Sequence, residues 1–150
     1  MATFTYFSHE ALARYLVMFG LGELQSFTPI TEGIENSNYF VTLSQHGSET
    51  HYVLTILESL SFDEAPFFNK LLARLSKDAL PVAAPKMTLD GMSSTIFCGK
   101  PTFLFPRLQG DHPGEITQTH CYKLGIFIAT THLSLLALNL HRDNPYAAGW

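Results

Sequence analysis

The chain has 150 residues, enough for one domain, and 46% of them are hydrophobic while 15% are charged. This balance excludes a disordered chain, and the net charge of −4 provides no basic field for binding nucleic acid or an anionic membrane. No apolar run approaches the ~20 residues of a membrane span, and residues 1–15 match neither a signal peptide nor a transit peptide. We therefore expect a cytoplasmic protein that binds neither nucleic acid nor membrane.

The chain begins with a predicted helix. Ser8 is a suitable N-cap, Leu12, Leu16 and Phe19 recur at helical spacing, and Gly20 is a suitable stop.

Strands follow on both sides of a polar loop. Glu23–Thr31 leads into the loop as a short strand, and Ser37–Ser44 leaves it with alternating apolar residues. After a turn over Gln45–Thr50, His51–Glu58 is apolar on both faces, which is typical of a strand covered on both sides.

The middle of the chain predicts a second helix and a hairpin. Asp63–Asp78 has an apolar stripe at helical spacing and a proline in its first turn. Lys86–Leu89 and Ser94–Phe97 are predicted to form a hairpin around Asp90-Gly91, and Thr102–Phe105 is a further strand.

A long helix is expected from about Thr117 to Leu138, followed by a linker over Asn139–Trp150. Hairpin-like connections in this order of elements favour an antiparallel sheet with flanking helices. The predicted fold class is therefore α+β, not a doubly wound parallel sheet.

Few residues predict chemistry by themselves. A polar loop between strands can turn backbone N–H groups toward a phosphate, although Asn36 and Asn38 are equally suited to an ordinary turn. Cys98 and Cys121 share no motif spacing, so we expect two thiols. The seven histidines lack metal-ligand spacing, so no metal site is predicted, and His132 is interpreted as a core histidine.

A longer motif gives a specific resemblance. Homoserine kinases of the aminoglycoside-phosphotransferase (choline kinase-like) fold carry a Glu-Gly-x-Glu-Asn-Ser-Asn-Tyr/Phe segment, matched here by Glu32, Gly33, Glu35, Asn36, Ser37, Asn38 and Tyr39. The chain resembles the N-terminal half of these enzymes. The resemblance implies a protein-kinase-like N-lobe in residues 1–108, and a hinge exit, the first C-lobe helix and a linker in residues 109–150.

The resemblance also implies nucleotide-binding residues. Gly33, Ile34, Glu35, Asn36, Ser37 and Asn38 correspond to the loop that covers the ATP phosphates. Thr55 stands where many kinases place a lysine that pairs with a glutamate on the next helix. That helix offers Glu64 near its start, then Asn69 and Lys70 where a partner would be sought, and Lys70 could supply a cation from the helix instead. In the hinge, Phe105 would border the adenine, the Pro106 carbonyl would accept a hydrogen bond and the Leu108 N–H would donate one.

The family's catalytic aspartate and Mg²⁺ ligands are expected in a later segment. His141-Arg142-Asp143-Asn144 resembles that catalytic loop, but its spacing is wrong. We therefore expect the front part of an ATP-dependent kinase that phosphorylates the L-homoserine hydroxyl in threonine biosynthesis, inactive alone. A choline or aminoglycoside kinase and a non-catalytic nucleotide-binding or interaction module stay open. The apolar face of the last helix (Leu124, Ile128, Leu135, Leu138) is expected to favour self-association.

Overall fold

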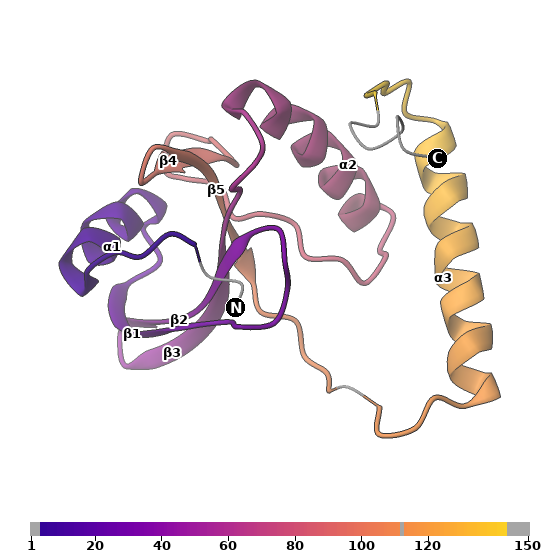
Figure 1. The fold of residues 1–150 in the computed structure, drawn as a ribbon, viewed down its shortest axis with the longest axis horizontal. Coiled ribbons are helices and arrows are strands. Elements are labelled where there is room, and N and C mark those ends of the chain that lie inside the picture. Colours follow the sequence, from indigo (N-terminus) through magenta and orange to yellow (C-terminus); the bar gives the residue numbers. More distant parts are fainter. Residues whose placement is uncertain (1–3, 112, 144–150) are drawn as a thin grey trace.

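A computed structural model describes residues 4–111 and 113–143. Its strands form one antiparallel sheet in the order β1-β2-β3-β5-β4, with helices beside it (Figure 1). The strands are β1 (Glu23–Pro29), β2 (Ser37–Gln45), β3 (Ser48–Ile56), β4 (Thr95–Phe97) and β5 (Lys100–Pro106). The helices are α1 (His9–Leu16), α2 (Ala65–Lys77) and α3 (Gln118–Leu136), with short 3₁₀ turns η1 (Val17–Phe19) and η2 (Phe62–Glu64). The predicted α+β class is confirmed.

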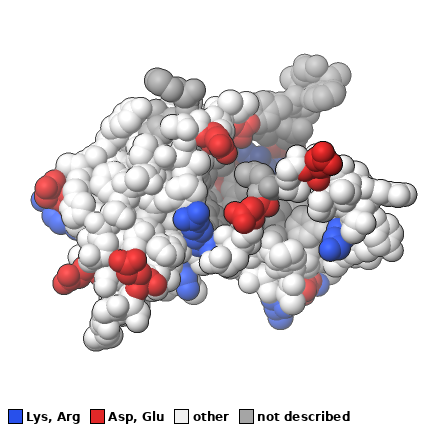
Figure 2. Space-filling view, turned by 90° about the horizontal axis from the view of Figure 1, so that it is seen from below, with Lys and Arg blue, Asp and Glu red and all other residues white. Residues whose placement is uncertain are grey.

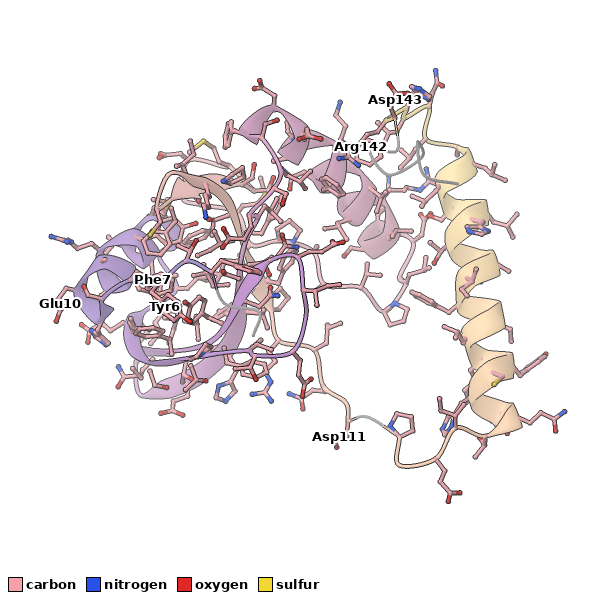
Figure 3. All side chains as sticks on the ribbon, in the orientation of Figure 1. Tyr6, Phe7, Glu10, Asp111, Arg142 and Asp143 are labelled. Atoms are coloured by element: carbon pink, nitrogen blue, oxygen red, sulfur yellow. The ribbon has the colours of Figure 1, made fainter. Side chains whose placement is uncertain are left out.

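Helix α1 covers one face of the sheet. The Ser8 hydroxyl accepts a hydrogen bond from the Ala11 N–H at 3.2 Å, and the chain leaves η1 through Gly20 at a φ of 62°. Alternation along β2 and β3 turns every second side chain toward α1, which builds the main core. Phe7 lies between α1 and the sheet and contacts Phe27, Tyr39 and Phe97 (Figure 3).

The β2–β3 hairpin is tighter than predicted. Its turn is His46-Gly47, with φ values of 52° and 80°, and Gln45 already pairs with Ser48. Two left-handed residues suit the twist of a two-residue hairpin, so the polar residues Ser48–Thr50 continue the strand. The prediction that β3 is covered on both faces is also wrong, because Val53 and Thr55 are only half-buried.

The second predicted hairpin is wrong in its pairing. The segment Lys86–Leu89 forms no strand, and its Lys86 N–H donates instead to the Leu104 carbonyl at 2.7 Å. Strand β4 pairs with β5 across the turn Cys98-Gly99, where both residues have positive φ. The Asp90-Gly91 turn does form, but it belongs to a loop closed by the Thr88 N–H and the Met92 carbonyl at 2.8 Å.

A smaller core lies on the opposite face of the sheet. Leu57, Ala65 and Phe103 are buried there, and Phe68 of α2 packs against them. Helix α2 therefore covers only part of this face, and the remainder stays open.

A cluster of polar side chains ties the start of the chain to the base of the polar loop. The Ser37 hydroxyl accepts hydrogen bonds from the Phe4 and Thr5 N–H groups at 2.8 and 3.0 Å and donates to Glu58. The Thr5 hydroxyl also donates to Glu58 at 2.8 Å, and Lys100 forms an ion pair with the same carboxylate. Burial raises the pKa of Glu58, but these hydrogen bonds from Lys100, Ser37 and Thr5 outweigh it, so the pKa lies below its usual range.

Helix α3 starts as predicted, with the Thr117 hydroxyl accepting a hydrogen bond from the His120 N–H. It lies against α2, and the Ser134 hydroxyl donates to Asp78 at 2.5 Å (Figure 1). Leu124 and Ile128 are 57% and 45% exposed, whereas Leu135 and Leu138 are half-buried. His132 is exposed, so its interpretation as a core histidine is wrong. The predicted linker lies partly outside the described residues. No helix of the described part is long and apolar enough to cross a bilayer.

We expect Glu58→Gln to lower the free energy of unfolding by about 1–3 kcal/mol at pH 7, because it removes the charge that pairs with Lys100 and weakens two hydrogen bonds. The folded-state pKa of Glu58 lies below the ordinary value of 4.5, so its contribution is present above that pH and is lost as the pH falls through the folded-state pKa. The difference between wild type and variant should therefore shrink in acid. Urea unfolding at pH 7 and below pH 4 measures both.

Glu49→Gln is the matched control, because Glu49 is an exposed carboxylate on β3. Its effect should stay within about 0.5 kcal/mol at either pH. Equal effects of the two variants would show that the polar cluster contributes no stability of its own.

Candidate functional site

The open part of the sheet forms the floor of a cleft of about 670 Å³, called here the main cleft. Phe40, Val53 and Phe105 lie side by side on β2, β3 and β5, because the register pairs Phe40 with Val53 and Val53 with Phe105. All three line the cleft. The floor is therefore apolar and supplied by three neighbouring strands, which suits an apolar ring.

One wall of the main cleft is the segment that leaves β5. Pro106, Arg107 and Leu108 all line it, together with Ala83 from the segment after α2. The Arg107 N–H donates to the His51 carbonyl at 3.0 Å, and its guanidinium lies 4.3 Å from the centre of the Phe40 ring. The predicted hinge residues Phe105, Pro106 and Leu108 are thus gathered at one cleft.

The opposite wall is the polar loop, which covers residues 30–36 in the structure. It is closed at its base by the Ile30 N–H, which donates to the Asn38 carbonyl at 2.8 Å. Gly33 has a φ of 115°, a conformation that side chains disfavour, and Ile34 is 87% exposed at the tip. The first half of the loop, Ile30–Glu32, lines the main cleft, whereas Glu35 and Asn36 line a different cavity.

Internal hydrogen bonds hold the exit of the loop. Asn36 accepts the Glu58 N–H at 3.4 Å through its side-chain oxygen, and the Thr55 hydroxyl donates to the Asn38 side-chain oxygen at 2.8 Å. Thr55 and Asn38 are register partners on the face that carries Val53 and Phe40. The Ser37 side chain is fully buried in the polar cluster on the other face. Thr55 and Asn38 thus lie beside the cleft floor, whereas the Ser37 hydroxyl does not.

Two charged residues that were not predicted as site residues, Arg107 and Asp111, also line the main cleft. Asp111 lies on the segment between the sheet and α3 (Figure 3). Position in the sequence was the available signal, because Arg107 lies between the predicted hinge residues Pro106 and Leu108 and Asp111 follows shortly after them. Figure 2 views the molecule from below and shows red and blue residues scattered over the visible surface, so no single sign of charge dominates that view.

Among the residues that it describes, the structure forms no lysine–glutamate ion pair from the candidates Glu64 and Lys70. Glu64 caps its own helix turn by accepting from Ser61, and its other oxygen forms an ion pair with Arg142 at 2.7 Å. The hydrogen bond from Arg142 lowers the pKa of Glu64. Lys70 is exposed on α2. Asn144 of the rejected catalytic motif lies outside the described residues.

Metal ligands are not clustered either. Among residues 4–111 and 113–143, no three His, Cys, Asp or Glu side chains come close enough to hold one ion. The two cysteines are free and exposed.

Curated relatives match nearly all of the chain. A homoserine kinase of Cupriavidus pinatubonensis is 39% identical over 134 residues, which are 89% of this chain and 41% of that protein. A homoserine kinase of Neisseria meningitidis serogroup B is 36% identical over 100% of this chain and 48% of its own length. The chain thus spans less than half the length of these relatives.

A solved structure supports the fold. Amicoumacin kinase hAmiN, in complex with AMP-PNP, Ca²⁺ and Ami, matches with a TM-score of 0.68 at 16% identity, over 93% of this chain and 42% of that protein. At this identity the likeness concerns the fold alone, and it agrees with the kinase-like N-lobe expected from the sequence.

The model of the phosphotransferase enzyme family matches residues 26–147, which include β2, β3, the polar loop, the predicted hinge and α3. Because this match extends over most of the sequence, the chain belongs to the phosphotransferase enzyme family.

Proposed function

We propose that this chain is the nucleotide-binding part of an ATP-dependent homoserine kinase, which transfers the γ-phosphate of ATP to the hydroxyl of L-homoserine. The observation that carries the proposal is the similarity to homoserine kinases at 36–39% identity over 89–100% of the chain. In this proposal residues 1–108 act as the N-lobe, and residues 109–150 form the hinge exit and the first C-lobe helix.

The main cleft is the proposed site of the adenine and ribose. Its 670 Å³ lie within the usual range of small-molecule sites, and its apolar floor suits a purine ring. Phe105 would border the ring, the Pro106 carbonyl would accept from the exocyclic amine, and the Leu108 N–H would donate to the ring. Arg107 and Asp111, at the same cleft, would flank the ribose or the phosphates.

The polar loop is the proposed phosphate-binding element. Backbone N–H groups at Gly33, Ile34, Glu35 and Asn36 would face the phosphates, because consecutive amides in a tight loop form a concave anion site. Thr55 and Asn38 would hold the loop exit through their hydrogen bond. Ser37 would be a positioning residue, since its hydroxyl is used within the polar cluster.

Mg²⁺ would neutralise charge on the transferred phosphate when bound. The described residues do not provide a ligand set for it, so its ligands and the catalytic base would come from a segment outside them. We therefore propose that the 150 residues bind nucleotide without turning it over.

We expect Gly33→Ala to weaken binding of a fluorescent ATP analogue about fivefold to tenfold, because holding a side chain at this φ costs about 1 kcal/mol or more. Added methyl bulk is not the cause, since a Cβ at Gly33 would contact nothing within 4 Å. Gly47→Ala is the matched control, with positive φ and equally open surroundings in the β2–β3 turn. Similar affinities of the two variants for the analogue would show that the polar loop is not part of the nucleotide site.

A chimera tests the kinase proposal. The chain alone should release no ADP in a coupled assay with L-homoserine. Fusion to the segment of the Cupriavidus pinatubonensis homoserine kinase that follows the matched region should restore homoserine-dependent ADP release, because a positioned nucleotide then meets the catalytic groups. ADP release by the chain alone, or a folded but inactive chimera, would contradict the proposal.

We also propose that α3 mediates self-association of the isolated chain through Leu124 and Ile128, which are exposed apolar side chains one turn apart. Sedimentation should show dimers at high concentration, and the double change of these residues to Gln should reduce them. Leu133→Gln is the control, because Leu133 is 70% exposed but lies two and a half turns from Leu124, on the opposite side of the helix. A monomer at every concentration would refute the idea.

A further inference from the structure

A second cavity of about 410 Å³ lies on the other side of the polar loop. Glu35 and Asn36 of the loop line it, together with Ser59, Glu64, Phe68 and Arg142. The loop is therefore a shared wall, with Ile30–Glu32 at the main cleft and Glu35–Asn36 at the second cavity. A group-transfer enzyme needs its donor and acceptor sites close together, and the main cleft and the second cavity share this loop as a wall.

Arg142 is held firmly in the second cavity. Figure 3 places it between the end of α3 and α2. Its Nη2 donates to Glu64 at 2.7 Å, and its guanidinium lies 5.3 Å from the centre of the Phe68 ring. The side chain is only 24% exposed, and its Nε is buried without a hydrogen-bond partner among the described residues. A guanidinium has five N–H donors, so most of this binding capacity is unused by the described residues.

The two carboxylates that line the second cavity differ in whether they already have a partner. Glu64 is engaged by Arg142 and by Ser61. Glu35 is exposed at the loop, and no hydrogen bond or ion pair of its side chain occurs within the described part of the chain. Within the described part of the chain, the cavity is therefore lined both by unused guanidinium donors and by an unpaired carboxylate. A free phosphate would meet two carboxylates here, and a simple cation would leave the guanidinium donors unused.

We propose that the second cavity holds the head group of an amino-acid acceptor, with its α-carboxylate on Arg142 and its α-ammonium on Glu35. The proposal rests on the proposed function, because it names where the acceptor of that kinase sits. A zwitterion matches both charges at once, so its binding leaves neither group unpaired. The other end of the amino acid, which carries the hydroxyl, then lies beside the loop that would hold the phosphates.

Two analogues of L-homoserine separate the contacts. 3-Aminopropan-1-ol keeps the ammonium and lacks the carboxylate, whereas 4-hydroxybutanoate keeps the carboxylate and lacks the ammonium. Each ligand is titrated into the ¹⁵N-labelled 150-residue chain, and amide shifts are followed at Glu35, Asn36 and Ser59. We expect L-homoserine to shift these amides and to bind at least about tenfold more tightly than either analogue, since each loses one charge-assisted hydrogen bond.

The variants assign each contact to one residue. Arg142→Gln should weaken L-homoserine and 4-hydroxybutanoate about tenfold and leave 3-aminopropan-1-ol within about twofold. Glu35→Gln should weaken L-homoserine and 3-aminopropan-1-ol about tenfold and leave 4-hydroxybutanoate within about twofold. Because Glu35 is an exposed loop residue, its replacement should leave the fold intact. Arg74→Gln is the matched control, since Arg74 also pairs with a carboxylate of the α2 region, Asp78, but lies outside the cavity.

The results separate this inference from the proposed function. No shift at the cavity with L-homoserine, or equal losses for all three ligands in Arg142→Gln and Glu35→Gln, would overturn the inference even where the chimera phosphorylates homoserine. An inactive chimera with the predicted pattern of analogue binding would overturn the kinase and keep the amino-acid site.

Discussion

Side chains of β2, β3 and β5 alternate between a face that α1 covers and a face that α2 covers only in part. Because the backbone fixes this alternation, every second side chain points into the main core, and the side chains between them point to the opposite face of the sheet. Tyr39, Val41 and Leu54 are therefore buried under α1, whereas Phe40 and Val53 form the floor of the main cleft. The cleft is a direct product of the sheet, and a shift in register would remove it together with the core.

The polar loop is held to this sheet at both of its ends. Its exit is fixed on one face by Thr55 and Asn38 and on the other by Ser37 within the cluster around Glu58. Between these anchors and Ile30, the loop exposes its tip and divides the main cleft from the second cavity. Rigid ends with a free tip suit an element that covers a substrate and releases it. Loops placed in this way on a scaffold commonly carry the binding groups of an enzyme.

Local patterns predicted the helices and most of the strands, because capping and periodicity are encoded by near neighbours. The hinge residues Phe105, Pro106 and Leu108 were expected only from the family resemblance, and all three line the main cleft. Contacts between distant segments were not predictable in this way. No local signal reveals that Lys86 bonds the β5 backbone, so a false hairpin was assigned to its segment. Likewise, Arg142 donates a hydrogen bond to Glu64 across 78 residues, whereas the sequence around Arg142 indicated only a catalytic motif with the wrong spacing.

The cluster around Glu58 also bears on how the chain folds. The β1–β2–β3 hairpins close over short sequence distances, but Lys100 reaches Thr5 across 95 residues and Thr5 reaches Glu58 across 53. Contacts of such separation carry a high loop-closure entropy and form after the local ones. The anchor of the polar loop is therefore completed only when β5 has joined the sheet. A nascent chain that has not yet released residue 100 from the ribosome would contain the loop sequence without its anchor.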